Sequence, residues 1–144
     1  MGRVINTNSP TKIRNYQRRT IAEMLTQLGQ KQTVDEEAKD MVATIVFALR
    51  TLYDVAEETA SAWEKRDYWM KAERFLRQWE WTKGMAANLE DVLREEAWDL
   101  LPQLMMDLFA QFSDVQVKSM TRKPDEWQGA YARLMAAEPN TLLD

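Results

Sequence analysis

Apolar residues recur every three or four positions along most of this chain, the spacing that places them on one face of an α-helix. The first such stripe begins at Ser9-Pro10 and stops at Gly29. Serine suits the position before a helix, proline its first position and glycine its end. We therefore predict a helix over residues 10–28, whose buried face consists of Ile13, Ile21, Met24, Leu25 and Leu28.

A second helix is predicted to follow Thr33, which we assign as its N-cap, and to run to about Ala60. Residues 35–37 are all acidic and fall in its first turn, where carboxylates interact favourably with the helix dipole. Between residues 41 and 56 the charged residues are Arg50 and Asp54 alone, so apolar side chains face almost every direction. A helix of this kind is covered by its neighbours, and we expect it to be the most enclosed of the bundle.

A third helical stretch is predicted over residues 62–83. The junction with the second helix contains neither Gly nor Pro, so one bent helix of about 45 residues is an alternative. A turn near Ser61 or Asp67 agrees better with the usual length of helices. We therefore expect two antiparallel helices here.

The C-terminal half predicts a long helix and two short ones. Gly84 is expected to end the third helix, and Asn88 to cap a fourth that reaches Phe112. Pro102 lies inside that fourth helix and predicts a kink or break, because proline removes one backbone hydrogen bond. A short helix is expected near residues 115–120, and another from Pro124 to just before Pro139.

These elements predict an all-α fold, an antiparallel bundle of four main helices with one or two short C-terminal helices. Residues 1–8 are polar, and we expect them to form a flexible N-terminus. Residues 9–144 are expected to form one domain, since a chain of this size usually builds one core.

The composition removes several kinds of chemistry. The chain has 144 residues and contains neither Cys nor His. Disulfides, thiolate nucleophiles and imidazole-based catalysis or metal binding are therefore excluded. No apolar stretch approaches the roughly 18 residues that suggest a membrane-spanning helix. We expect a cytoplasmic protein that binds no cofactor.

Basic residues are concentrated near the N-terminus, where residues 1–33 hold six of them and a single acid, Glu23. Such a segment could contact nucleic-acid phosphates. On a helical wheel, however, the basic residues divide between the two flanks of the apolar stripe, as expected for side chains that border a buried face. The candidate basic patch consists of Lys12, Arg14, Arg18 and Arg19.

Four of the six tryptophans fall in the predicted third helix. If that helix is unbroken, Trp69 and Trp79 lie on its core-facing arc, whereas Trp63 and Trp81 lie on the opposite side. Trp, Met and Arg are enriched at the centres of protein interfaces. We therefore predict an interface made of Trp63, Met70, Arg74, Arg77 and Trp81.

Paired carboxylates are the remaining candidate for catalysis. The segment Glu96-Ala97-Trp98-Asp99 resembles the second metal-binding motif of all-α nucleotide pyrophosphohydrolases of the MazG type. The resemblance implies that Glu96 and Asp99 would hold Mg²⁺ beside a nucleoside triphosphate. The nearest candidates for the family's first motif begin at Asp54 and at Glu64, and neither matches its pattern.

The sequence thus favours a non-catalytic interaction or regulatory module that associates with itself, as a homodimer, or with a protein partner. A MazG-like Mg²⁺-dependent enzyme and nucleic-acid binding through the basic first helix are the alternatives. A helical bundle supports all three functions, so the fold class alone does not distinguish them.

Overall fold

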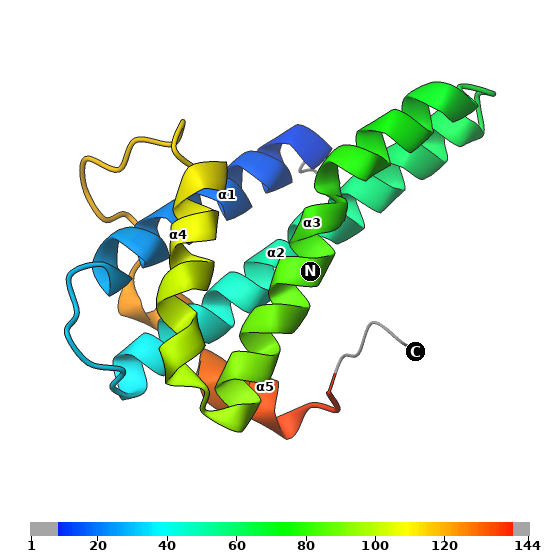
Figure 1. The fold of residues 1–144 in the computed structure, drawn as a ribbon. Coiled ribbons are helices and arrows are strands. Elements are labelled where there is room, and N and C mark those ends of the chain that lie inside the picture. The colour runs from blue at the N-terminus through cyan, green and yellow to red at the C-terminus, as the bar shows by residue number, and fades with distance from the viewer. Residues whose placement is uncertain (1–8, 140–144) are drawn as a thin grey trace.

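The computed structural model describes residues 9–139, which are helical and contain no strand. The predicted flexible segment 1–8 lies outside the described residues, as does 140–144. The all-α fold is confirmed (Figure 1). Its elements are α1 (Pro10–Leu28), α2 (Glu36–Glu64), α3 (Trp69–Glu95), the short 3-10 helix η2 (Trp98–Leu100), α4 (Leu101–Gln111), the 3-10 helix η3 (Pro124–Glu126) and α5 (Ala130–Ala136).

Local capping explains where the first two helices start. The Ser9 side chain accepts a hydrogen bond of 3.2 Å from the backbone N–H of Lys12, and Pro10 occupies the first turn, as predicted. The predicted cap of α2 at Thr33 is wrong. Asp35 is the N-cap, and its carboxylate accepts a 2.8 Å hydrogen bond from the backbone N–H of Ala38. A carboxylate at this position accepts a stronger, charge-assisted hydrogen bond than a hydroxyl does.

α2 and α3 form an antiparallel hairpin whose end projects from the rest of the molecule (Figure 1). The chain reverses at Asp67, one of the two predicted turn positions, which adopts a left-handed conformation with φ 66°. The backbone N–H of Tyr68 donates to the carbonyl of Trp63 at 2.9 Å and closes the turn. The second and third helices are therefore separate.

α3 is longer than predicted and passes through both Gly84 and Asn88. An isolated glycine costs a helix about 1 kcal/mol, which the packing of α3 on α2 outweighs. α3 ends instead at Glu95, where Glu96 is left-handed with φ 54°. Pro102 lies in the first turn of α4, where its missing N–H breaks no helical hydrogen bond.

The segment between α4 and η3 contains no α-helix, so the short helix predicted near residues 115–120 is wrong. The helix predicted from Pro124 is a single 3-10 turn followed by α5. The buried hydrophobic core nevertheless includes Trp127 and Leu134 from this end of the chain. α2 packs against α1, α3 and α5, and residues 41–49 are buried except at two positions.

None of the helices between residues 9 and 139 combines the length and the apolar character that spanning a bilayer would require.

Candidate interaction surface

The projecting end of the α2–α3 hairpin exposes three large side chains in succession. Tyr68 is 46 % exposed, Trp69 60 % and Met70 69 %, so the prediction that Trp69 faces the core is wrong. Together with Arg66 and Lys71 they line a shallow hollow, and we call these five residues the hairpin tip. Isolated exposed apolar residues are common, but a contiguous group marks a binding surface.

The cations of the hairpin tip lie against aromatic rings. The Arg66 guanidinium is 5.1 Å from the centroid of the Tyr68 ring, and the Lys71 ammonium is 4.5 Å from that of Trp63. Neither cation forms an ion pair within the described residues. The tip therefore presents cations and apolar area together, beside the acidic Asp67 that lines the same hollow. Aromatic, Met and Arg side chains are the types enriched at protein interfaces.

The five predicted interface residues do not share one helix face. Their alignment assumed a helix unbroken between Trp63 and Trp81, whereas Trp63 belongs to α2 and Trp81 to α3. Both indoles are half-buried: Trp63 packs edge-on against Phe75 at 5.0 Å, and Trp81 packs against Phe112 at 5.8 Å. The other three predicted residues lie exposed on α3.

A stripe of positions in steps of four and three residues follows α3 from the hairpin tip to its C-terminus, and such steps keep to one face of a helix. Arg74 lies in its first half and Asp91 in its second. Neither forms an ion pair within residues 9–139. The α3 stripe consists of Met70, Arg74, Arg77, Trp81, Gly84, Asn88, Asp91 and Glu95.

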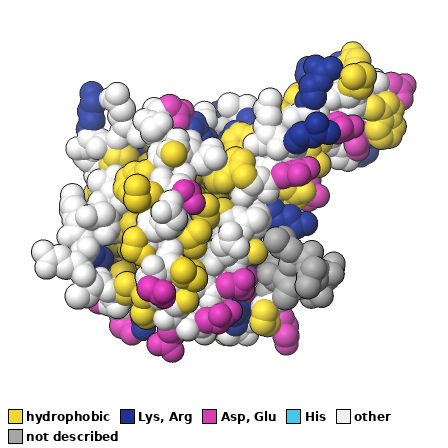
Figure 2. Space-filling model, in the orientation of Figure 1, with side chains coloured by type: hydrophobic (Ala, Val, Ile, Leu, Met, Phe, Trp, Pro, Cys, Tyr) yellow, Lys and Arg dark blue, Asp and Glu magenta, His cyan; other side chains and the backbone are white. Residues whose placement is uncertain are grey.

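Charge is segregated along this stripe. Arginines occupy the half near the hairpin tip, and acids occupy the half near α4. Figure 2 shows Lys and Arg side chains together with acidic ones on the projecting hairpin, and further acidic side chains along the lower edge of the molecule. At the middle, Gly84 leaves open space: a Cβ added there would meet no atom within 4 Å.

A groove of about 400 Å³ lies between the acidic half of α3 and the start of α4. Asp91 and Glu95 line it from α3, Leu100 lines it from η2 and Leu104 from α4. Leu100 is 56 % exposed, and apolar side chains cover this part of the surface in Figure 2. The groove thus has an apolar lining and an acidic border.

The predicted basic patch is largely engaged within its own chain. The Arg14 guanidinium lies 5.3 Å from the centroid of the Phe75 ring, and burial and the neighbouring Arg18 lower the pKa of Arg14. Arg18 forms a 2.6 Å ion pair with Asp114. Arg19 binds Glu23 at 2.7 Å and also donates to two backbone carbonyls of the segment after α4. Lys12 alone of the four is fully exposed.

The two carboxylates of the MazG-like segment are not on one helix. Glu96 is the left-handed residue that terminates α3, and Asp99 lies in η2. Among residues 9–139 no three acidic side chains are placed so that they could hold a metal ion. The regular helical spacing that the resemblance implied is therefore wrong for this segment.

The sequence analysis did not predict a role for Glu23, which is a buried carboxylate in the structure. The available signal was that Glu23 is the single acid of the basic first helix. Its Oε1 accepts hydrogen bonds of 2.8 Å from the backbone N–H groups of Thr121 and Arg122. Its Oε2 accepts from the Thr121 hydroxyl at 2.5 Å and from Arg19 at 2.7 Å. Burial alone would raise the pKa of Glu23, but these hydrogen bonds together lower it to about 2.

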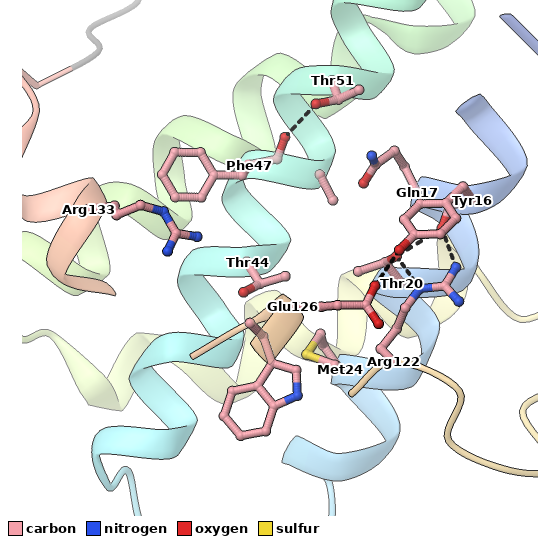
Figure 3. Close-up of a pocket in the computed structure, with 12 residues that line it drawn as sticks. Tyr16, Gln17, Thr20, Met24, Thr44, Phe47, Thr51, Arg122, Glu126 and Arg133 are labelled. Atoms are coloured by element: carbon pink, nitrogen blue, oxygen red, sulfur yellow. Dashed lines mark hydrogen bonds between the residues drawn. The ribbon is translucent and has the colours of Figure 1, made fainter. Parts of the chain in front are cut away.

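A cavity of about 250 Å³ with polar and apolar lining residues lies near Glu23 and its partners, between α1, α2 and the C-terminal segment. Figure 3 shows Tyr16, Arg122 and Glu126 directed toward one another on one side of it. Arg122 donates to the Thr20 hydroxyl at 2.8 Å and to the Tyr16 carbonyl at 3.0 Å, while the Tyr16 hydroxyl donates to Glu126. These groups attach the C-terminal segment to α1, which is a structural task.

Comparison of this chain with protein-family models, with curated proteins and with solved structures finds no match. The candidate site therefore rests on the geometry above.

Proposed function

We propose that this protein is a non-catalytic helical interaction module that associates with a second copy of itself. The hairpin tip and the α3 stripe form the contact surface, and the cytoplasm is its location. The observation that carries the proposal is the contiguous exposure of Tyr68, Trp69 and Met70 on a hairpin that projects from the bundle.

The contrast with the alternatives supports this choice. Nucleic-acid binding would need free cations on α1, and three of its four candidate side chains are held by the chain itself. Metal-dependent catalysis would need convergent acids, which residues 9–139 do not provide. Exposed aromatic, Met and Arg side chains are more typical of a surface that binds a protein than of a nucleic-acid site or a metal-dependent active site.

The test is the mass of the protein in solution, measured by sedimentation equilibrium across a concentration series. We expect a dimer that the Met70→Glu variant dissociates, because the new carboxylate must lose its hydration inside the interface. Met106→Glu is the matched control. Met106 is exposed to a similar extent, 65 % against 69 % for Met70, and lies on α4.

A monomer at every concentration would refute the proposal. Equal dissociation by the two variants would also refute this choice of surface, since the two substitutions differ only in their location.

A further inference from the structure

The α3 stripe is complementary to itself when reversed. Its first half carries Arg74 and Arg77, and its second half carries Asp91 and Glu95. Two copies of α3 placed in parallel would set like charges against each other at each of these positions. Placed antiparallel, the basic half of each copy faces the acidic half of the other, and repulsion becomes attraction.

One register pairs Arg74 with Asp91 and brings the two small central positions, Gly84 of each copy, into contact. If Trp81 of one copy lies opposite Gly84 of the other, then Arg74 lies opposite Asp91, and Met70 opposite Glu95, because the positions are spaced symmetrically about the middle of α3. Arg74 and Asp91 each form no ion pair within residues 9–139 and are available for this pairing. Arg77 is held by an exposed ion pair with Glu73, which contributes little and is easily exchanged.

The shape of the α3 surface also fits this register, both at the middle of the helix and at its two ends. The open space beside Gly84 lets the exposed part of Trp81 from the second copy come close to the helix, while that indole keeps its contact with Phe112 of its own chain. In the same register the hairpin tip of each copy reaches the end of the other copy's α3, beside the groove lined by Leu100 and Leu104. Trp69 and Met70 would there contact apolar side chains, while Arg66 and Lys71 lie near the acidic border.

We propose that two copies of this chain pair through antiparallel α3 helices, with Trp81 of each copy against Gly84 of the other and each hairpin tip at the α3–α4 groove of the opposite copy. This inference rests on the proposed self-association and specifies its geometry. Each contact occurs twice, because a two-fold axis relates the two copies. This axis passes between the two α3 helices, at the level midway between Trp81 and Gly84.

Because the chain contains no cysteine, single-cysteine variants can test this register without background. In the antiparallel pair, the two copies of position 84 are offset by about 4.5 Å along the helix axis, and the two copies of position 88 by about 16 Å. A disulfide requires Cα atoms within about 7 Å. Position 84 itself is left as glycine, because a cysteine there would occupy the space that receives Trp81, and the test uses positions 77 and 88 instead.

Arg77→Cys and Asn88→Cys are each expected to stay unlinked alone, but to give a mixed disulfide dimer when combined, since these positions face each other. Met106→Cys is the control for random collision, and non-reducing electrophoresis with mass spectrometry identifies the products. Linkage of Arg77→Cys and Asn88→Cys each to itself would indicate parallel helices and overturn the register.

The remaining outcomes separate this inference from the function on which it rests. A dimeric mass with no disulfide at any of these positions would overturn the α3 pairing while leaving self-association intact. A monomeric mass would remove both. Equal linkage of all variants, Met106→Cys included, would mean collision and would also count against the pairing.

Charge reversal provides a second, independent measurement. Arg74→Glu alone and Asp91→Arg alone should each weaken dimerisation at least tenfold, because each places like charges together twice. An equimolar mixture of these two variants should recover most of the affinity as a heterodimer, since every such contact is again between opposite charges. Failure of the mixture to recover would contradict the pairing of positions 74 and 91.

Discussion

Within residues 9–139, charged side chains are paired in one region of the molecule and unpaired in another. The first region, which we call the Glu23 cluster, consists of Glu23, Arg19, Thr121 and Arg122, and the second is the hairpin tip. At the cluster, one buried carboxylate accepts hydrogen bonds from Arg19, from the Thr121 hydroxyl and from two backbone N–H groups. At the tip, Arg66 and Lys71 each lie against an aromatic ring and form no ion pair with an acid among the described residues. The first region therefore stabilises the fold, and the second is available to a partner.

Removal of the buried carboxylate is the strongest test of this contrast. Glu23→Ala should lower the free energy of unfolding by about 3 kcal/mol, because it leaves Arg19 and two backbone N–H groups without their acceptor in a buried site. Urea denaturation followed by circular dichroism measures the loss. The exposed carboxylate of α2, Glu57, offers a control, and Glu57→Ala should change stability by less than about 0.5 kcal/mol. Equal losses of stability in Glu23→Ala and Glu57→Ala would contradict the structural role of the Glu23 cluster.

Acid should act on the same cluster. The pKa of Glu23 in the folded protein is about 2, below its usual value of 4.5, so the folded state favours the charged form. Its stabilisation is complete above pH 4.5 and disappears as the pH falls toward 2, and it amounts to about 3 kcal/mol at most. In Glu23→Gln this part of the pH dependence should be absent. A variant with the same acid dependence as the parent chain would contradict the assignment.

Gly84 lies in the middle of α3, and its substitution should change stability in the opposite direction. Gly84→Ala should raise the stability of the monomer by about 0.5–1 kcal/mol, because alanine is a better helix former and a Cβ meets nothing within 4 Å. Thermal unfolding in dilute solution measures the gain. Destabilisation would show that α3 is not a regular helix at this position.

The smallest effect on folding is expected at the tip. Trp69→Ser should change the free energy of unfolding by less than about 0.5 kcal/mol, because the indole is 60 % exposed. Dimer affinity should nevertheless fall markedly, by tenfold or more if Trp69 is a central contact. A large loss of stability in a variant that still dimerises would assign Trp69 to the fold and reverse the comparison.

Local signals in the sequence predicted the helical parts of the fold well. The start of α1 at Ser9-Pro10, its end at Gly29 and the turn at Asp67 each depend on a few neighbouring residues. The predictions that Gly84 ends a helix and that Asn88 caps the next one were wrong. The local preference of these residues for helix ends is worth less free energy than the packing of a long amphipathic face. Of the predicted interface, Met70, Arg74 and Arg77 remain together, but the alignment of Trp63 with Trp81 depended on a helix that the turn divides.

By itself, the sequence determined that this protein is helical and that it has no thiol or imidazole chemistry, because periodicity and composition are properties of the chain. It did not determine every inward face, since Trp69 was predicted to face the core and is 60 % exposed. The tertiary structure decided that Glu23 would meet Thr121 and Arg122, and that the end of one hairpin would stand clear of the bundle. Contacts between residues about a hundred positions apart depend on how whole helices pack, and no local pattern records that choice.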